Sequence, residues 1–210
     1  MIDRLFVLIP AAGASRRMGR PKQLLEVEGQ SLLHRACRLA LELEELDCVR
    51  RVDVLVVTGA NGPVVEKHVT DARLPVDVVY CKDWSRGLGA SIAFGLHGEL
   101  AREASHLLVL LPDQPDVKLS YLQEMLESTD LKLNSVAATA YGSQPGVPAV
   151  FPASYRSELI GLTGDRGARD YLRELWRSNR CQLFQSPSGP PLDLDTPEEY
   201  ERYARTHGDR

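Results

Sequence analysis

Five apolar runs recur along the first two thirds of the chain, separated by segments with helical periodicity. The runs are rich in Val and Leu and show little alternation with polar residues, which is typical of strands buried on both faces of a sheet. They cover residues 5–10, 52–58, 76–80, 106–112 and 135–141. We therefore predict at least these strands in one sheet.

The segments between the runs carry apolar residues at the spacing of amphipathic helices. Ser31 stands at the N-cap position of the first helix, and Pro63 stands in the first turn of the second. The predicted helices cover residues 32–46, 62–72, 89–103 and 119–129. Alternation of strands and helices predicts an α/β fold of the Rossmann-like three-layer αβα type, with a mostly parallel sheet and helices on both faces.

The last third of the chain is organised differently. LTGDRGARDYLRELW (162–176) is a glycine-bounded loop that leads into a helix, and LDLDTPEEYERYAR (192–205) starts a helix at Pro197 with acidic residues in its first turn. We expect a single domain over residues 1–210, with residues 142–210 as its elaborated C-terminal part.

The composition of the chain argues against several classes of function. Hydrophobic residues make up 43% and charged residues 26% of the chain, as in a folded globular protein, and the net charge of −4 argues against a nucleic-acid surface. The four cysteines form no C-x-x-C pair, so neither a disulfide framework nor a zinc site is indicated. No signal peptide and no apolar run long enough to span a bilayer are visible. We expect a cytoplasmic protein without a membrane partner.

The most unusual stretch is IPAAGASRRMGRPKQLL (9–25), which directly follows the first strand. Four cations, Arg16, Arg17, Arg20 and Lys22, fall within seven positions. Small side chains let backbone amides approach a phosphate closely, and Arg and Lys add charge-assisted donors. The stretch matches neither G-x-x-x-x-G-K-[ST] nor G-x-G-x-x-G. It indicates a phosphate-binding loop of another kind, with a solvated basic turn as the plain alternative.

Carboxylates follow the fourth apolar run and recur near the C-terminus. Asp113 comes directly after the strand, where it could hold Mg²⁺ together with substrate phosphates or simply cap a turn. Asp193 and Asp195 alternate with Leu194, so both carboxylates face the same way in an extended segment. Either could join Asp113, or Asp195 or Thr196 could instead cap the helix that starts at Pro197.

In their order along the chain, five motifs resemble those of the nucleotidyltransferases that attach a nucleotide to molybdopterin, within the nucleotide-diphospho-sugar transferase superfamily. The motifs are AAGASRRMGRPKQLL, LPDQPDV, GVPAVF, GDRGAR and LDLDTP. Ala11-Ala12-Gly13 and RGLGAS (86–91) look like the cytidylyl branch of that family. Arg16 and Val147 depart from the pattern, since many cytidylyl members carry serine at the first position and several carry histidine at the second.

The resemblance implies a reaction and its residues. CMP would pass from CTP to the terminal phosphate of molybdenum-loaded molybdopterin with release of pyrophosphate, in the presence of Mg²⁺. Residues 1–141 would bind the nucleotide and residues 142–210 would face the acceptor. Arg17, Lys22 and Asp113 would be catalytic, and Asp113 with Asp195 would bind the metal. The implied nucleotide-binding residues are Ala11, Ala12, Gly13, Ser15, Arg17, Lys22, Thr58, Gly59, Gly87 and Ser91.

Two other classes of function remain open at this point. One is a nucleotidyltransferase of the same fold that uses GTP for the same cofactor, or that acts on a sugar or alcohol phosphate. The other is a non-enzymatic carrier that shelters molybdopterin and delivers it. The resemblance also implies a molybdenum hydroxylase or its maturation chaperone as a protein partner.

Overall fold

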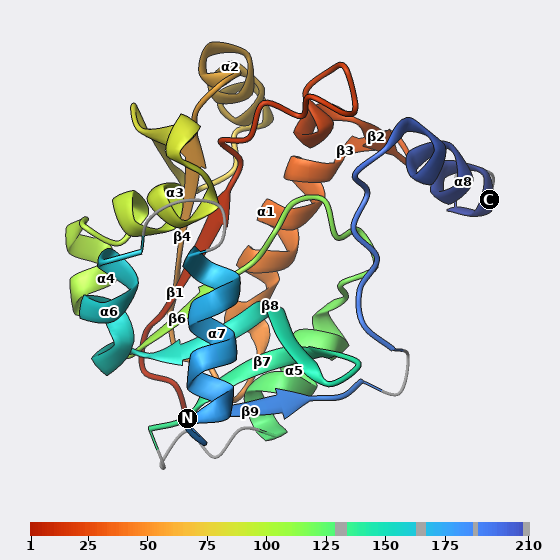
Figure 1. Ribbon diagram of the computed structural model, residues 1–210. Coiled ribbons are helices and arrows are strands. Elements are labelled where there is room, and N and C mark those ends of the chain that lie inside the picture. Colours follow the sequence, from red (N-terminus) through yellow and green to blue (C-terminus); the bar gives the residue numbers. More distant parts are fainter. Residues whose placement is uncertain (129–133, 163–166, 187–188, 208–210) are drawn as a thin grey trace.

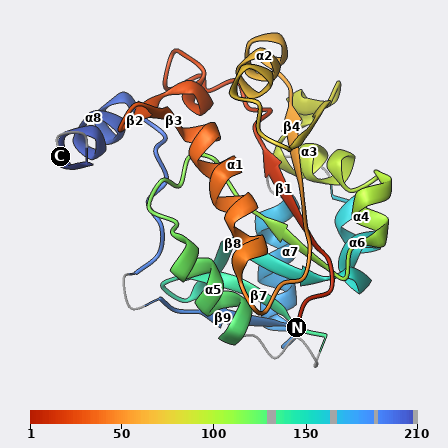
Figure 2. The same cartoon turned by 180° about the vertical axis from the view of Figure 1, so that it is seen from behind.

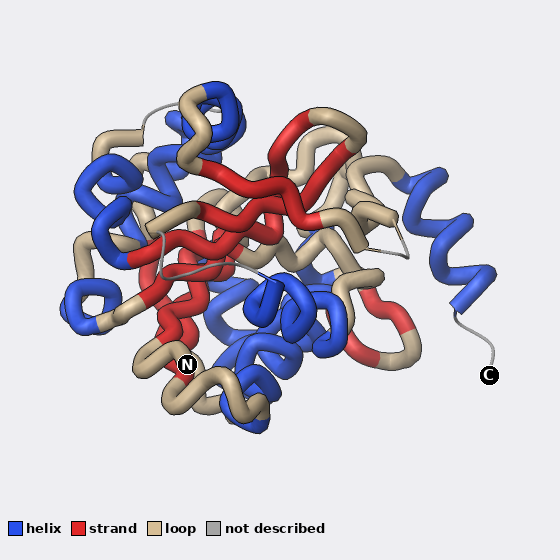
Figure 3. The backbone as a smooth tube through the Cα atoms, turned by 90° about the horizontal axis from the view of Figure 1, so that it is seen from below, coloured by secondary structure: helices blue, strands red, loops and turns tan. Residues whose placement is uncertain are grey.

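A seven-stranded sheet lies between two layers of helices in the computed structural model, which describes residues 1–128, 134–162, 167–186 and 189–207 (Figures 1 and 3). The strand order is β5-β4-β1-β6-β8-β7-β9. The strands are β1 (Leu5–Pro10), β4 (Val52–Thr58), β5 (Asp77–Tyr80), β6 (His106–Val109), β7 (Val136–Tyr141), β8 (Gln144–Pro152) and β9 (Cys181–Phe184). A separate antiparallel pair is formed by β2 (Glu26–Val27) and β3 (Gln30–Ser31).

The sheet confirms the five predicted strands and adds two that the pattern did not indicate. β8 runs antiparallel to both β6 and β7, whereas β1, β4, β5 and β6 pair in parallel. Pro145, Gly146 and Pro148 weaken the strand signal of β8, because proline removes a ladder hydrogen bond and glycine weakens strands. Since β8 lies between β6 and β7, both predicted parts of the chain contribute to one sheet. The expectation of a single domain stays a prediction.

The helices match the periodicity with one exception. They are α1 (Leu32–Glu42), α2 (Gly62–Ala72), α3 (Leu88–Gly95), α4 (Glu99–Glu103), α5 (Leu119–Ser128), α6 (Arg156–Ile160), α7 (Gly167–Arg177) and α8 (Pro197–His207), with short 3₁₀ turns η1 (Lys22–Leu24), η2 (Leu43–Glu45), η3 (Trp84–Arg86) and η5 (Ala153–Tyr155). The prediction of one helix over 89–103 was wrong. The chain breaks between α3 and α4, where Gly98 takes an extended conformation as the N-cap of α4. As predicted, Ser31 caps α1, and its side chain accepts a hydrogen bond from the amide of His34 at 3.0 Å.

Alternate residues of β1 face the two helical layers. Leu5, Val7 and Ile9 pack into the cluster formed with α1, α2 and α5, which Figure 2 shows from behind. Phe6 and Leu8 pack on the other face, with residues of α3, α4, α6 and α7. Burying such a side chain contributes about 1.5–3 kcal/mol, so β1 is anchored from both sides. Its carboxyl end, together with those of β4 and β6, therefore forms a rigid edge for the loops that follow.

Among the described helices, none combines the length and the apolar character needed to cross a membrane.

Candidate functional site

The loop between β1 and η1 is held closed by Ser15. This residue has a φ of 51°, which is uncommon outside glycine. Its carbonyl accepts hydrogen bonds from the amides of Met18 and Gly19 at 3.0 and 3.1 Å. Its hydroxyl accepts one from the amide of Lys22 at 3.1 Å. Ser15 thereby shapes the basic loop and fixes the backbone from which the Lys22 side chain starts.

Gln23 braces the same loop from inside and was not foreseen from the sequence. Its side chain is 2% exposed, and its amide nitrogen donates to the carbonyls of Ala11 at 2.9 Å and Gly13 at 3.0 Å. In the sequence, the only hint of this role is that the polar residue Gln23 directly precedes Leu24 and Leu25. On the outer side, a Cβ added to Gly13 would meet nothing within 4 Å, so this part of the backbone faces open space.

A pocket of about 420 Å³ opens beside this loop, at the carboxyl edge of the sheet. Its volume lies in the range of small-molecule sites. Its walls are the basic loop, the η3–α3 segment and the residues after β6. Of the predicted site residues, the structure brings Ala12, Gly13, Ser15, Lys22, Gly87, Ser91 and Asp113 to the pocket. Arg16 of the predicted basic loop also lines the pocket, and Trp84 and Ser85 are lining residues that were not predicted.

Gly87 shows why this wall needs glycine. It precedes α3 with a φ of 100°, a backbone conformation that L side chains rarely adopt. Ser91, 2% exposed, follows on the first turn of the helix. A helix N-terminus carries partial positive charge, which favours an anionic ligand in the pocket.

Other predicted residues lie behind the pocket. The prediction that Thr58 contacts the nucleotide is not supported by its placement, because its buried hydroxyl donates to Glu66 Oε1 at 2.8 Å and also lies 3.2 Å from the carbonyl of Val79. Thr58, at the end of β4, therefore uses its hydroxyl for hydrogen bonds inside the protein. Ala11 is 2% exposed and does not line the pocket.

Gly59 supports the pocket wall through close packing. A Cβ at this position would lie 2.6 Å from Cβ of Trp84 and 2.7 Å from both Cβ and the carbonyl oxygen of Ala12. Because a backbone atom is among these neighbours, Gly59→Ala is expected to lower the free energy of unfolding by about 1–3 kcal/mol and to weaken nucleotide binding. Urea unfolding and calorimetric titration measure the two effects. Gly98→Ala is the matched control, since its nearest neighbour would be 3.9 Å away. Equal losses in both variants would contradict this explanation.

Four charged side chains meet at the rim of the pocket. The ammonium of Lys22 forms an ion pair with Asp113 Oδ2 and a second with Asp195 Oδ1 at 2.7 Å. Arg17 reaches Asp195 Oδ2 at 3.3 Å but is 74% exposed, so this pair is weak. The predicted residues Arg17, Lys22, Asp113 and Asp195 thus lie together, with Lys22 at the centre.

The cluster stabilises its own charges. Burial alone would lower the pKa of Lys22, but the charges and hydrogen bonds of the two carboxylates outweigh it and raise that pKa. The hydrogen bond from Lys22 in turn lowers the pKa of Asp195. Lys22 is therefore a cation and Asp195 an anion at neutral pH.

A second group of polar side chains extends the site toward the C-terminal part of the chain. The amide nitrogen of Gln114 lies 2.8 Å from both Asp193 Oδ1 and the hydroxyl of Tyr141. Burial raises the pKa of Asp193, as do the nearby charges of Asp113 and Asp195. Gln114 and Tyr141 were not among the predicted residues, because their partners are distant in sequence. In this arrangement the carboxylate of Asp193 accepts a hydrogen bond from the side-chain amide of Gln114, while the carboxylate of Asp195 faces Lys22.

The helix that follows is capped by its own residues, which leaves the Asp195 side chain available. Thr196 Oγ1 accepts a hydrogen bond from the amide of Glu199 at 3.3 Å, and Glu199 Oε2 accepts from the amides of Thr196 and Asp195 at 2.9 Å. This is a capping box with Thr196 as N-cap. Of the two capping alternatives considered from the sequence, Thr196 is the residue used.

Thr196→Ala is expected to lower the free energy of unfolding by about 1 kcal/mol, the usual contribution of an N-cap hydroxyl. Urea denaturation measures this change. Thr206→Ala, near the other end of α8, removes a hydroxyl that bonds to the carbonyls of Arg202 and Tyr203 and to Nδ1 of the exposed His207, and it should have a smaller effect. A larger loss from Thr206→Ala than from Thr196→Ala would contradict the capping role.

The carboxylates fit a divalent cation shared with substrate phosphates. Within the described residues, no group of three or more His, Cys, Asp and Glu side chains could hold a metal ion by itself. Asp113 Oδ1, however, is buried without a hydrogen-bond partner, and Asp113 Oδ2 and Asp195 Oδ1 both face one cation. Mg²⁺ binds through one or two carboxylates plus phosphates, so this donor set is suitable.

The remaining predicted motifs lie in the C-terminal part. GVPAVF belongs to β8, and the Val147 carbonyl accepts hydrogen bonds from the Gln114–Tyr141 group. Gly164, Asp165 and Arg166 of GDRGAR lie outside the described residues, and Arg169 is exposed on the first turn of α7.

Comparison with known proteins agrees with the fold. The sequence matches the MobA-like NTP transferase domain over residues 7–180. It is 28% identical over 197 residues to the purine catabolism protein PucB of Bacillus subtilis, with 93% of each chain covered. It is 24% identical over 204 residues to the probable molybdenum cofactor guanylyltransferase of Opitutus terrae, with 94% of this chain and 93% of that protein covered.

Solved structures show the same arrangement. Rv0371c from Mycobacterium tuberculosis H37Rv matches with a TM-score of 0.76 and 25% identity over 96% of this chain and 98% of that chain. The same protein in complex with manganese matches with a TM-score of 0.71 and 23% identity, over 98% and 100% of the two chains. The nucleotide-diphospho-sugar transferase type of fold, predicted from the sequence, is confirmed.

Proposed function

Because the chain belongs to the MobA-like NTP transferase domain family, we propose that it is the nucleotidyltransferase that completes a molybdenum cofactor with cytidine. It would transfer CMP from CTP to the terminal phosphate of molybdenum-loaded molybdopterin, forming molybdopterin cytosine dinucleotide and pyrophosphate. That the chain is a nucleotidyltransferase follows from its family. The choice of CTP, the acceptor and the residue roles are the proposal.

The observation that carries the proposal is the position of Lys22. An ammonium group has three N–H donors. Two of them serve Asp113 and Asp195, and Lys22 also lines the pocket beside Gly13 and Ser15. One donor is thus left for a phosphate at the point where the carboxylates meet the nucleotide pocket.

The reaction needs charge and alignment more than a base. The acceptor phosphate is already anionic, so its oxygen can attack the α-phosphorus of CTP directly. A P–O bond to the acceptor forms, the bond to the β-phosphate oxygen breaks, and pyrophosphate leaves. Lys22 and Arg17 would offset the negative charge that develops on the leaving group, while the loop around Gly13 positions the phosphates.

Asp113 and Asp195 would hold Mg²⁺. When bound, the ion supplies positive charge to the phosphate oxygens. The unpaired Asp113 Oδ1 supports this assignment, and so does the manganese complex of the M. tuberculosis structural relative.

The acceptor side would be formed by the C-terminal part. Asp193, Tyr141 and Gln114 contact one another, do not line the nucleotide pocket, and offer both donors and acceptors. We propose that residues 142–170 contact the pterin. A molybdenum hydroxylase or its maturation chaperone would receive the product.

Two features favour different nucleotides. Ala11-Ala12-Gly13 and RGLGAS resemble the cytidylyl branch, which supports CTP. The relative from Opitutus terrae is named a guanylyltransferase, which makes GTP the second candidate.

A nucleotide panel decides between the two. Pyrophosphate release is measured with Mg²⁺ and anaerobic molybdenum-loaded molybdopterin, with CTP, GTP, ATP and UTP in parallel. We expect release with CTP alone. Release with GTP alone would overturn the cytidylyl assignment but keep the reaction type. Release that requires a sugar or alcohol phosphate in place of molybdopterin would overturn the acceptor.

A further inference from the structure

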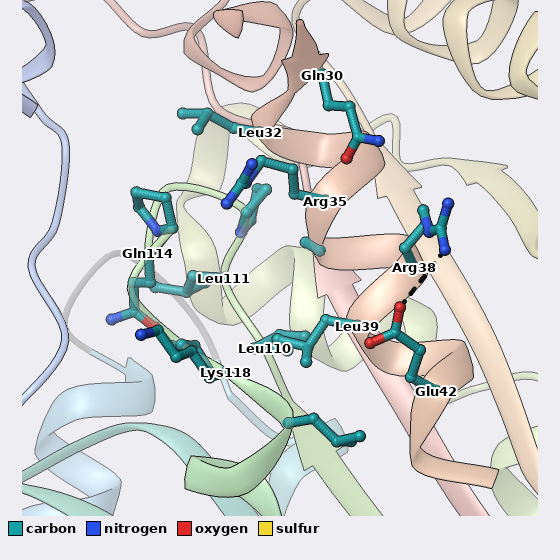
Figure 4. A pocket seen from close by; sticks show the side chains of 15 residues that line it. Gln30, Leu32, Arg35, Arg38, Leu39, Glu42, Leu110, Leu111, Gln114 and Lys118 are labelled. Carbon is teal, nitrogen blue, oxygen red and sulfur yellow. Dashed lines mark ion pairs between the residues drawn. The ribbon is translucent and has the colours of Figure 1, made fainter. Parts of the chain in front are cut away.

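A second cavity lies beside the nucleotide pocket, on the α1 side of the loop that carries Asp113 (Figure 4). It has a volume of about 470 Å³ and opens between α1 and residues 110–119, and we refer to it as the α1 cavity. Leu111 and Pro112 line both spaces, whereas Asp113 lines the nucleotide pocket and not the α1 cavity. The two sites therefore share a wall but have different chemistry.

Cationic side chains line the α1 cavity. Arg35 donates to Glu28 Oε2 at 2.9 Å, and Arg38 lies 3.7 Å from Glu42, a loose pair drawn in Figure 4. Lys118 stands on the opposite wall, exposed and without an ion-pair partner in the described part of the chain. The cavity thus keeps positive charge in a protein whose net charge is −4. Such a local field favours an anion.

Gln114 adds an unsatisfied acceptor. Its nitrogen lies 2.8 Å from Asp193 Oδ1 and 3.1 Å from the carbonyl of Val147. Both neighbours are acceptors only, so the orientation of the amide is fixed with its nitrogen toward them. Oε1 has no hydrogen-bond partner although the side chain is only 4% exposed, and Gln114 lines the α1 cavity. A buried acceptor without a partner is costly, so a ligand that donates to it is favoured.

Apart from Gln30 and Glu42, the rest of the wall is apolar. Leu32, Leu39, Leu110 and Leu111 face the cavity, together with Pro115. Surfaces of this kind accommodate the body of a flat ring, while a few polar groups fix its orientation.

We propose that the α1 cavity binds a small nitrogen heterocycle that carries an anionic group. The anion lies among Arg35, Arg38 and Lys118, a ring N–H donates to Gln114 Oε1, and the ring packs on the leucines. This site is separate from the nucleotide pocket and does not depend on which nucleotide the enzyme uses.

Calorimetric titration of the full chain with orotate tests the proposal. Orotate combines a carboxylate with ring N–H donors, and benzoate is the matched probe without a donor. We expect saturable binding of orotate that weakens at least about tenfold for benzoate, because Oε1 then stays unpaired. Arg38→Ala and Lys118→Ala should each weaken orotate binding severalfold, while Arg102→Ala, an exposed arginine on α4, should not.

Titration of Lys22→Ala locates the probe. Orotate affinity should be unchanged in this variant, since Lys22 lies in the nucleotide pocket. The proposal is overturned if orotate does not bind, if benzoate binds equally well, or if Lys22→Ala abolishes binding that Arg38→Ala and Lys118→Ala leave intact. Circular dichroism of each variant verifies that it is folded.

Discussion

Lys22→Ala is expected to lower turnover about a hundredfold, the usual loss when one preorganised donor to a transition state is removed. The variant leaves Asp113 and Asp195 without the cation that now lies between them. Their affinity for Mg²⁺ should therefore be retained or increased. Initial rates across a Mg²⁺ titration separate the effect on turnover from the effect on Mg²⁺ affinity. The maximum rate should fall, whereas the Mg²⁺ concentration that gives half of it should not rise.

Lys67→Ala is the matched control. Lys67 is a surface lysine of α2 that pairs with Asp71 at 2.7 Å and is 75% exposed. Its removal should leave turnover unchanged. A Lys22→Ala enzyme that turns over at the wild-type rate would remove Lys22 from the reaction.

Asp113→Asn is expected to abolish Mg²⁺-dependent turnover. The carboxylate of Asp113 is one of the two that face Lys22. Asparagine keeps the size of this side chain but removes the negative charge that would make it a metal ligand. Loss of the metal removes positive charge that the substrate phosphates need. Turnover and the near-ultraviolet circular dichroism spectrum, measured together, distinguish loss of the metal site from unfolding of the variant.

Asp71→Asn, at an exposed position of α2, serves as the control and should retain full activity. Persistent Mg²⁺-dependent turnover in Asp113→Asn, with a native spectrum, would exclude Asp113 as the metal ligand.

Local patterns predicted much of this architecture. The strands 5–10 and 52–58 are largely apolar. The loops that follow parallel strands meet at one edge of a sheet, which predicted that the basic loop and Asp113 lie together. Lys22 indeed pairs with Asp113. The helix prediction over 89–103 failed because periodicity does not register a glycine-marked break such as that at Gly98.

Residues whose importance depends on distant partners could not be predicted. Gln114 contacts Asp193, 79 positions away, and nothing in its sequence surroundings indicates this. Gln23 supports the loop by contacts to backbone carbonyls, which any sequence has. Thr58 was assigned to the nucleotide site although the fold uses its hydroxyl internally, and only the position of Glu66 shows that.

Transfer of label from CTP to the acceptor tests the central claim most directly. CTP labelled at the α-phosphate is incubated with Mg²⁺ and anaerobic molybdenum-loaded molybdopterin, and the products are separated. We predict that label appears in molybdopterin cytosine dinucleotide in equal amount to pyrophosphate, and that Asp113→Asn forms neither. Binding of the cofactor without any transfer of label from CTP, under conditions where the wild-type protein is folded, would contradict the proposed reaction.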